Sequence, residues 1–333
     1  MTGTIRWGIL STANIALKRF IPGVKVSRNG TIAAIASRDL TKAKTAAEAH
    51  GIPKAYGSYE ELLADPDIDA IYNPLPNALH AEWTAKAAAA GKPILCEKPL
   101  ATGTAEALRM IEVCAYNDVL LMEAFMYRFH PQHARVRDLI EAGTIGELRA
   151  VRASFSFLLE PFQKKNVRLQ HDLGGGALAD VGCYAVNAAR MLFGEEPLWA
   201  SAQWDVREQF GVDVSTAGVL CFSDRRMATI DCGFRASTYG TYTAIGTKGH
   251  IDVPDAFVPD GDVAIVMTVG SERREERLSA VHQFALEAEE FADCLLSGRP
   301  LRIPPLDAVA NLHVIDALAR SATALGMRTD VRR

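Results

Sequence analysis

The sequence predicts an α/β protein, in which a doubly wound parallel sheet is followed by an α+β domain with a large open mixed sheet. Through the first 123 residues, short apolar runs alternate with longer Ala-rich stretches, which is the pattern of βαβ units with helices on both faces of a parallel sheet. Farther on, polar and apolar residues alternate over several long stretches, as in an antiparallel or mixed sheet. A chain of 333 residues also exceeds one ordinary hydrophobic core. We therefore expect two domains, at 1–123 and 124–333.

The elements of the first domain are bounded by residues that start or stop helices. Thr41 precedes one helical stretch and Gly51 follows it, Ser58 precedes another, and Gly91 closes a third, as N-cap and C-cap preferences require. Strands are expected at 4–10, 31–37, 68–73, 92–97 and 119–123, and helices at 15–27, 41–51, 58–65, 78–91 and 104–117.

The second domain begins with a helix and continues as sheet. Period-two alternation predicts strands whose one face is exposed or paired. The helix is expected at 131–143, the strands at 148–159, 198–210, 214–223, 227–234 and 242–253, and two late helices at 282–298 and 305–326. We expect the last of these helices to pack back on the first domain.

The charge pattern argues against a nucleic-acid partner. The net charge is −4, and Lys and Arg are scattered along the chain, so no basic stripe is available for phosphate backbones. The chain starts directly in strand-like sequence, and no apolar run approaches the roughly 18 residues of a membrane helix. We expect a soluble, cytoplasmic protein that binds small molecules.

Cysteine and histidine spacing gives no metal site. The six cysteines are widely spaced and form no C-x-x-C pair, so we interpret them as reduced core residues. His130 and His133 have no second ligand pair beside them, and an exposed loop explains them better than zinc does. No metal is expected.

The turn after the first strand is a candidate dinucleotide site. In nucleotide-binding βαβ units this turn reads G-x-G-x-x-A, and its helix N-terminus binds pyrophosphate. Here the pattern falls on Ser11, Thr12, Ala13, Asn14, Ile15 and Ala16. Small residues still let the backbone approach a phosphate, and the two hydroxyls add donors. A plain strand-helix turn without a ligand remains the alternative.

The end of the second strand favours NADP(H) over NAD(H). Sites that choose NAD place an acid there for the ribose 2′-OH, whereas NADP sites use Arg or hydroxyl donors around the 2′-phosphate. This chain has Ser37 and Arg38 at that position, and Lys42 follows one helical turn later. Asp39, next in the chain, keeps NAD open.

A buried strand ends in the residues Glu97, Lys98 and Pro99. Ligands of open parallel sheets bind at the carboxyl ends of the strands, so we expect Lys98 to point into the cofactor crevice. Hydride transfer at a carbon that bears oxygen needs a proton donor or acceptor and positive charge at that oxygen. Pro99 fixes the backbone, and a cis bond before it would aim the ammonium. Glu97 is either a partner that keeps Lys98 charged or half of a surface ion pair.

The glycine run at 174–176 leads into a second polar pair. Asp180 and Tyr184 are spaced i to i+4, so a helix would place them on one face. A nearby lysine ammonium would favour the phenolate of Tyr184 for acid–base work. The alternative is structural: Tyr184 as a packing residue and Asp180 as an acceptor for glycine amides.

Together these stretches resemble the glucose-fructose oxidoreductase, inositol dehydrogenase and rhizopine-catabolism oxidoreductase family. The resemblance rests on EKPL at 97–100 followed by GGGALADVGCY at 174–184, and it extends over nearly the whole chain, including IASR at 35–38 and LMEAFMYRFHPQ at 121–132. It implies an N-terminal Rossmann domain and a C-terminal open mixed sheet that often makes dimer or tetramer contacts.

The resemblance also implies roles for individual residues. Lys98 looks like the family's catalytic lysine, Tyr184 falls where members carry a His or Tyr acid–base residue, and Asp180 is similar to the accompanying acid. The implied cofactor contacts are Pro74, Leu75, Asn77 and His80 in one loop, Glu97 and Lys98, and Arg128 near the nicotinamide end. Asn187, where inositol-type members often have Asp, argues against an inositol dehydrogenase. The branch resembled contains NADP-dependent xylose dehydrogenases, dihydrodiol dehydrogenases and sugar ketoreductases.

The expected activity is hydride transfer between NADP(H) and a cyclic sugar, with oxidation of an aldopyranose at its anomeric carbon to the lactone as the first hypothesis. The sugar would contact Lys98, Asp180, Tyr184 and three further residues, Phe155, Asn166 and Arg168. One alternative is a keto-sugar reductase acting on a nucleotide-linked deoxysugar or an anhydrosugar. The other is a non-catalytic NADP-binding regulator. We expect a homodimer or homotetramer formed through the C-terminal sheet.

Overall fold

The computed structural model describes residues 3–159 and 166–331. The chain forms two compact units, one made of residues 1–129 and 282–309 and the other of 130–281 and 310–333. The first unit therefore takes in a segment from near the end of the chain. The expected domains 1–123 and 124–333 stay a prediction.

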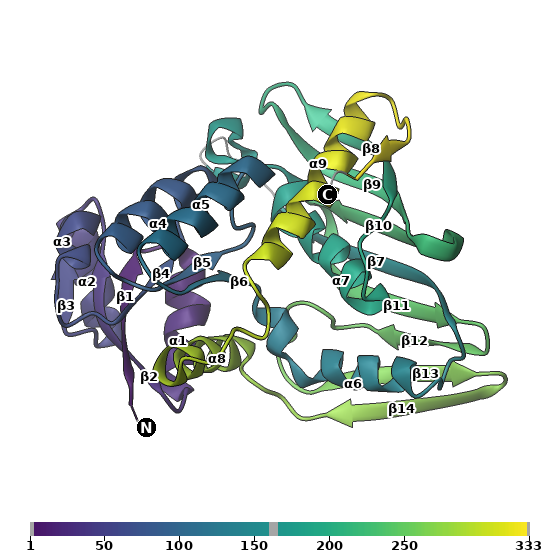
Figure 1. Cartoon of the computed structure of the whole chain (residues 1–333), viewed down its shortest axis with the longest axis horizontal. Helices are drawn as coiled ribbons and strands as arrows, with labels where there is room; N and C mark the ends of the chain where they lie inside the picture. The colour runs from purple at the N-terminus through teal and green to yellow at the C-terminus, as the bar shows by residue number, and fades with distance from the viewer. Residues whose placement is uncertain (1–2, 160–165, 332–333) are drawn as a thin grey trace. The chain divides into compact units, whose positions relative to one another are not determined.

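The first unit is built on a parallel sheet. Within the described residues this sheet has six strands in the order β3-β2-β1-β4-β5-β6 (Figure 1), and every recorded pairing is parallel. The order reverses between β1 and β4, which is where open α/β sheets bind ligands. The strands are β1 (Ile5–Leu10), β2 (Gly30–Ala36), β3 (Lys54–Tyr56), β4 (Ala70–Asn73), β5 (Ile94–Glu97) and β6 (Leu121–Ala124).

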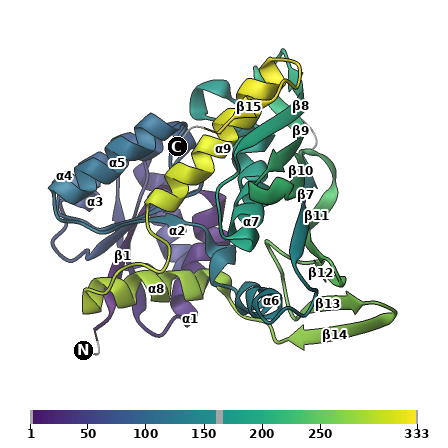
Figure 2. The same cartoon turned by 45° about the vertical axis from the view of Figure 1, so that its right-hand side comes forward.

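Helices cover both faces of this sheet. On one face, Trp7 of β1 packs edge-on against Phe20 and at a tilt against Phe291 of the late helix α8 (Gln283–Ser297). On the other face, a Cβ on Gly8 would lie 2.7 Å from Leu62 of α3, so only glycine allows this close approach. The other helices are η1 (Ala16–Phe20), α1 (Ile21–Val26), α2 (Leu40–His50), α3 (Tyr59–Leu63), η2 (Asn77–Leu79), α4 (His80–Ala89), α5 (Thr104–Tyr116) and η3 (Met126–Phe129) (Figure 2).

The predicted helix ends are confirmed at three positions and wrong at one. Gly91 follows the end of α4 in the left-handed conformation. The Ser58 side chain accepts a hydrogen bond from the Glu61 amide at the start of α3, and Gly51 ends α2 in the left-handed conformation. At the start of α2, however, the cap is Asp39 rather than Thr41. Aspartate and threonine both cap helices, so the sequence did not distinguish them.

The second unit carries a mixed sheet. Its order within the described residues is β14-β13-β12-β11-β7-β10-β9-β8-β15, and β10 runs parallel to β7 while its other neighbour, β9, is antiparallel. The sequence reading missed β13, β14 and β15. Strand β14 reads ERREERL, and a charged strand at a sheet edge discourages unwanted pairing but lacks the apolar alternation that predicts a strand. The strands are β7 (Leu148–Leu158), β8 (Trp199–Arg207), β9 (Val212–Cys221), β10 (Met227–Gly233), β11 (Arg235–Gly246), β12 (Gly249–Val253), β13 (Val263–Val269), β14 (Glu272–Leu278) and β15 (Thr329–Asp330).

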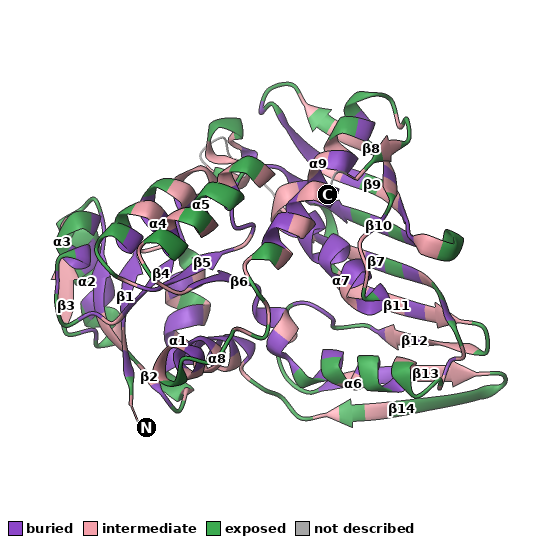
Figure 3. Cartoon of the chain, viewed as in Figure 1, coloured by how far each residue is buried: buried purple, intermediate pink, exposed green. Residues whose placement is uncertain are grey.

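Helix α7 (Cys183–Phe193) packs on β7 and β10 and is almost completely buried (Figure 3). A π-helical segment, η6 (Leu178–Gly182), leads into it. Helix α9 (Leu306–Thr323) begins in the segment 282–309 and continues in the second unit. The remaining helices are α6 (Pro131–Glu141), η4 (Val167–Leu169), η5 (His171–Leu173) and η7 (Ser223–Arg225).

The cysteines are free and buried, as expected. The interpretation of His130 and His133 as an exposed loop is wrong, because both are only 1% exposed. His130 caps α6 by accepting the Gln132 amide, and Nδ1 of His133 lies 2.8 Å from the Tyr242 hydroxyl. Within residues 3–159 and 166–331, no helix is long and apolar enough to cross a membrane.

Candidate functional site

Lys98 lies directly after β5, at the carboxyl end of the parallel sheet, and its side chain is half-buried. The Lys98–Pro99 peptide bond is cis, as the sequence reading anticipated. On one side of Lys98, the Tyr72 hydroxyl donates a 2.5 Å hydrogen bond to Glu97. On the other side, the Leu100 amide donates to Glu123 over 2.8 Å. The segment 97–100 is therefore tied to the strands on either side of β5.

His80 adds a third tie. Its two ring nitrogens lie 3.0 Å from the Pro99 carbonyl oxygen and 2.8 Å from that of Leu75. The ring is fully buried, and this burial lowers the pKa of His80, although the two carbonyls favour the charged ring. His80 thus holds the loop after β4 to the loop after β5, while its direct contact with a cofactor stays a prediction.

The other residues expected in the loop after β4 lie near His80. Pro74 and Leu75 are buried, and Asn77 is half-buried at the start of η2. The Leu75 amide donates to the Asn73 side chain over 3.4 Å. The loop is therefore shaped by its own polar contacts.

The turn after β1 keeps the backbone of a glycine turn without the glycine. Ser11 has a φ of 92°, a conformation that side chains rarely adopt, and its hydroxyl accepts the Ala13 amide. Thr12, Ala13 and Ile15 are half-buried and Asn14 is exposed. No side chain among the described residues caps the helical turn that starts at Ala16, so its amides suit the pyrophosphate of a dinucleotide.

At the end of β2, Asp39 is bonded to the helix that follows, and the Lys42 ammonium lies 3.9 Å from its carboxylate. The Asp39 carboxylate accepts the amides of Thr41 and Lys42 at the start of α2, so it is engaged with the helix. Arg38 and Lys42 are exposed, and Ser37 is buried with its hydroxyl accepting the Asp39 amide. These residues fit a 2′-phosphate better than a ribose diol.

Arg38 also contacts Tyr59. Burial raises the pKa of Tyr59, and Arg38, which bonds its phenol, opposes that rise. The guanidinium therefore lies beside the α3 helix at the edge of the expected cofactor site.

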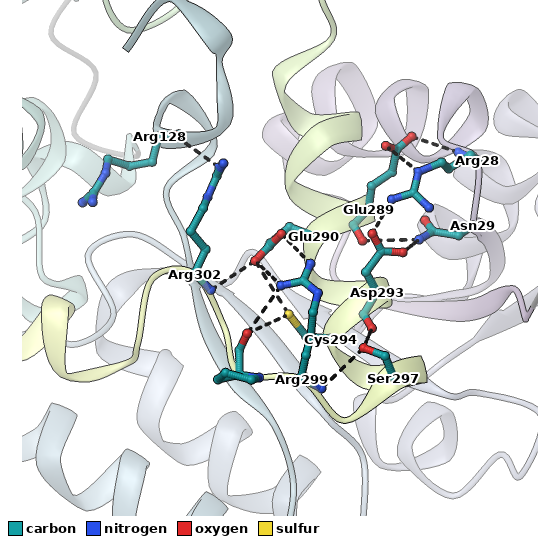
Figure 4. Close-up of polar contacts among 11 residues, drawn as sticks. Arg28, Asn29, Arg128, Glu289, Glu290, Asp293, Cys294, Ser297, Arg299 and Arg302 are labelled. Carbon is teal, nitrogen blue, oxygen red and sulfur yellow. Dashed lines mark hydrogen bonds and ion pairs between the residues drawn. The ribbon is translucent and has the colours of Figure 1, made fainter. Parts of the chain in front are cut away.

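Arg128 is ion-paired within the first unit. Its guanidinium lies 3.3 Å from the Asp307 carboxylate, and its backbone carbonyl accepts a hydrogen bond from Arg302 (Figure 4). The late segment 282–309 therefore positions this residue, which the sequence reading did not anticipate.

In the second unit, the glycine run is explained by two close approaches. A Cβ on Gly175 would lie 2.6 Å from the Arg168 carbonyl oxygen, and one on Gly176, whose φ is 122°, would lie 2.4 Å from the Asp213 carboxylate. The sequence predicted that the backbone of the glycine run passes close to another group. This is confirmed, and the neighbouring groups belong to Arg168 and Asp213.

Asp213 is a site residue that the sequence reading missed. Its carboxylate accepts the Leu178 amide over 2.8 Å and the Thr216 hydroxyl over 2.7 Å, so it holds the start of the helix that carries Tyr184. Burial raises its pKa, and these hydrogen bonds oppose the rise. The available signal was an acid between two valines at 212–214.

Asp180 binds Arg168. The Arg168 Nε donates to the Asp180 carboxylate over 2.6 Å, and its guanidinium lies over the Phe157 ring. Asn166 accepts the Arg168 amide over 3.1 Å. The structure thus brings together three of the residues that were expected to contact the sugar.

Tyr184 is only 4% exposed, and its ring packs among aromatic side chains. The ring centroid lies 5.1 Å from that of Phe155 and 5.4 Å from that of Phe257. Phe155 was expected to contact the sugar, which stays a prediction, and Phe257 was not singled out from the sequence. Asp180 lies in the π-helical segment and Tyr184 in α7, so the two are not on one regular α-helix. Lys98 and Tyr184 belong to different units, and their convergence stays a prediction.

Comparison with known proteins identifies the family. Residues 5–125 match the oxidoreductase family with an NAD-binding Rossmann fold, and residues 133–252 match the GFO/IDH/MocA C-terminal domain. The D-xylose 1-dehydrogenase (NADP(+)) 2 of Haloferax volcanii is 39% identical over 318 residues, covering 95% of this chain and 97% of that protein. A trans-1,2-dihydrobenzene-1,2-diol dehydrogenase of Xenopus tropicalis is 35% identical over 329 residues, covering 95% and 96%.

A solved structure agrees with these relatives. The chain matches KijD10, a 3-ketoreductase from Actinomadura kijaniata in complex with NADP and TDP-benzene, with a TM-score of 0.91 at 33% identity, covering 96% of this chain and 98% of that one. The resemblance, the fold class and the assignment as an oxidoreductase are confirmed. The chain therefore belongs to the GFO/IDH/MocA family of oxidoreductases.

Proposed function

We propose that this oxidoreductase uses NADP(H) and acts on a cyclic sugar, oxidising an aldopyranose at its anomeric carbon to the lactone. The observation that carries the proposal is Lys98, a half-buried side chain at the carboxyl end of β5 whose segment is tied on both sides. The relative named as an NADP-dependent D-xylose 1-dehydrogenase supports the substrate class.

The choice of NADP(H) rests on the end of β2. Asp39 is the acid that an NAD site would use, and its carboxylate is already bonded to the first amides of α2. Arg38 and Lys42 are exposed beside it, and a guanidinium pairs well with a phosphate. The NADP-bound ketoreductase and the NADP-dependent dehydrogenase support the same choice.

The chemistry assigns separate roles to Lys98 and Tyr184. NADP, when bound, supplies the acceptor for the hydride that leaves the anomeric carbon. Tyr184 takes the proton of the hydroxyl on that carbon, and Lys98 favours the phenolate and stabilises negative charge on the sugar oxygen. The C–H and O–H bonds break as the carbonyl of the lactone forms. This mechanism requires both side chains to reach one sugar.

The Asp180–Arg168 pair fits a neutral substrate. Its two charges compensate each other at 2.6 Å, and each partner retains lone pairs or donors for sugar hydroxyls. Asn166 and Phe155 are the proposed further wall residues. Phe155 offers an apolar ring beside Tyr184.

A keto-sugar reductase is the second candidate, favoured by the similarity to the 3-ketoreductase over 96% of this chain. The same residues would serve the reverse direction, with Tyr184 donating a proton to the ketone oxygen. The proposal of a non-catalytic regulator is weaker, because both expected acid–base residues are present.

The deciding experiment follows nicotinamide absorbance with purified protein. Xylose and glucose are offered with NADP and with NAD, and keto-sugars, free and nucleotide-linked, are offered with NADPH. Aldose oxidation with NADP supports the proposed dehydrogenase. Keto-sugar reduction without aldose oxidation supports the keto-sugar reductase instead. Tight NADPH binding without turnover of any sugar would support the regulator. Light scattering tests the proposed homodimer or homotetramer.

A further inference from the structure

The outward acids of α8 are paired with cations. Glu289 and Asp293 bind Arg28, and Asp293 also accepts the Asn29 side chain over 2.8 Å (Figure 4). Glu290 accepts Arg299 over 2.7 Å and the Arg302 amide over 3.1 Å. These contacts fasten α8 to the rest of the first unit.

Glu287 on the same helix has a different environment. It is 0% exposed and lies in the buried stripe formed with Phe284, Ala288, Phe291 and Ala292. Neither of its carboxyl oxygens has a hydrogen-bond partner among the residues that the structure describes. A buried charge without a partner is very costly, so this carboxyl group is expected to hold a proton.

The acids that act on Glu287 are Glu97 and Glu123. Each is 8% exposed, and each already accepts a hydrogen bond, from the Tyr72 hydroxyl and from the Leu100 amide respectively. Helix α8 packs on η3, which directly follows β6, and Glu287 therefore lies within electrostatic reach of the two carboxylates that tie down the segment carrying Lys98.

Three buried carboxyl groups that repel one another electrostatically are not expected to be charged together. Burial and the two neighbouring acids raise the pKa of Glu287 well above its usual value. Among the other titratable groups on elements packed against α8, Lys18 and Lys25 are exposed, Arg19 is half-buried, Arg128 is paired with Asp307, and Tyr127 is a buried phenol. The structure therefore favours Glu287 as the member that carries the proton.

We propose that Glu287 is a positioning residue for Lys98: as an uncharged carboxylic acid it allows Glu97 and Glu123 to keep the bonds that hold the segment 97–100. Ionisation of Glu287 would add a third negative charge and push these carboxylates away. The importance of Lys98 rests on the proposed function. The protonation of Glu287, and the loosening of the segment 97–100 when Glu287 ionises, do not.

The first test compares Glu287→Gln with Glu290→Gln as a matched control. Because Glu287 has a raised pKa, it contributes most stability at low pH and loses that contribution as the pH rises. A permanently neutral glutamine should therefore raise the Tm relative to wild type by an amount that grows from about pH 5 to about pH 9, reaching about 2 °C or more.

The control should respond with the opposite sign. Burial opposes ionisation of Glu290, but its bonds from Arg299 and the Arg302 amide outweigh burial and lower its pKa. Glu290→Gln should therefore lower the Tm throughout this pH range. A Tm difference for Glu287→Gln that stays flat or shrinks with rising pH would overturn the proposal.

The second test measures positioning without any sugar. Hydrogen–deuterium exchange of the peptide covering 97–101, corrected for the intrinsic rate, should lose protection about tenfold in wild type toward alkaline pH and stay constant in Glu287→Gln. Equal pH dependence in both proteins contradicts the positioning role. Since neither test needs turnover, a failure of the sugar reaction is recognised separately. If turnover is found, kcat should be measured as a function of pH. The pH at which kcat falls on the alkaline side should differ from wild type in Glu287→Gln and equal that of wild type in Glu290→Gln.

Discussion

The segment that carries Lys98 and the helix that carries Tyr184 are held by different forces. Around Lys98, three buried polar contacts, made by Glu97, Glu123 and His80, fix a short loop. Around Tyr184, aromatic rings surround the side chain, the Asp213 carboxylate accepts the Leu178 amide at the start of η6, and the Asn311 side chain donates to the Cys183 carbonyl at the start of α7. A loop at a strand end has free backbone groups and needs polar partners, whereas a helix satisfies its own backbone and can rely on packing.

This difference predicts different sensitivities. Polar ties in a buried place depend on protonation and fail when one partner is removed. Aromatic packing depends on shape, and it tolerates the loss of a single hydroxyl. Variants of the two regions should therefore separate effects on chemistry from effects on stability.

The largest effect is expected for Lys98→Met. Removing the ammonium should lower kcat by about 10²- to 10⁴-fold, because both charge stabilisation and activation of the tyrosine are lost. NADPH fluorescence titration should show that the cofactor still binds. Unchanged turnover in this variant would refute the proposed mechanism.

Tyr184→Phe should lower kcat by about 10²- to 10³-fold, because the proposed acid–base group is lost, while the variant should still fold. The ring keeps its contacts with Phe155 and Phe257, and only the hydroxyl is lost. The control is Tyr116→Phe, at a side chain that is 90% exposed. If both variants retained full activity, the acid–base role would belong to another residue.

Arg38→Ala should raise the KM for NADP by about 10- to 100-fold, which corresponds to the loss of a charge-assisted contact to phosphate. The KM for NAD should change little, because NAD lacks the 2′-phosphate. Steady-state kinetics with both cofactors measures the two values. An equal rise of both KM values would mean that Arg38 contacts a part of the dinucleotide that NADP and NAD share.

The smallest effect on activity is expected for Asp213, which acts on the helix rather than on the substrate. Asp213→Ala should lower the free energy of unfolding by about 1–3 kcal/mol, since the Leu178 amide and the Thr216 hydroxyl lose their acceptor. Asp213→Asn retains an acceptor and should lose less. Denaturant titration provides the comparison, and equal stability of all three proteins would show that the cap is dispensable.

Much of the fold could be read from local patterns, because period and capping residues act within one element. The strand expected at 92–97 is Ile94–Glu97, and the helix expected at 131–143 is Pro131–Glu141. Strand β3 was missed because its three residues are all half-buried, so they show no alternation of polar and apolar positions.

The candidate site was predicted only in part. Motifs located Lys98, Asp180 and Tyr184, but Asp213 and Phe257 reach the site from distant parts of the second unit. Glu287 shows the same limit, because its apolar stripe predicts a buried helix face and gives no sign of the two acids it meets. Contacts between segments far apart in the chain depend on packing that no local pattern encodes.

The return of residues 282–309 to the first unit has a consequence for biosynthesis. Phe291 packs on Trp7 on one face of the parallel sheet, and ion pairs with Arg28 join α8 to the turn between α1 and β2. A ribosome delivers α8 only after all six strands of this sheet and the residues 130–281 of the second unit have been made. Until then Phe20 packs on Trp7 but Phe291 does not, so the nascent sheet must wait with one face only partly covered, and chaperones that bind exposed aromatic surface would meet it during that interval.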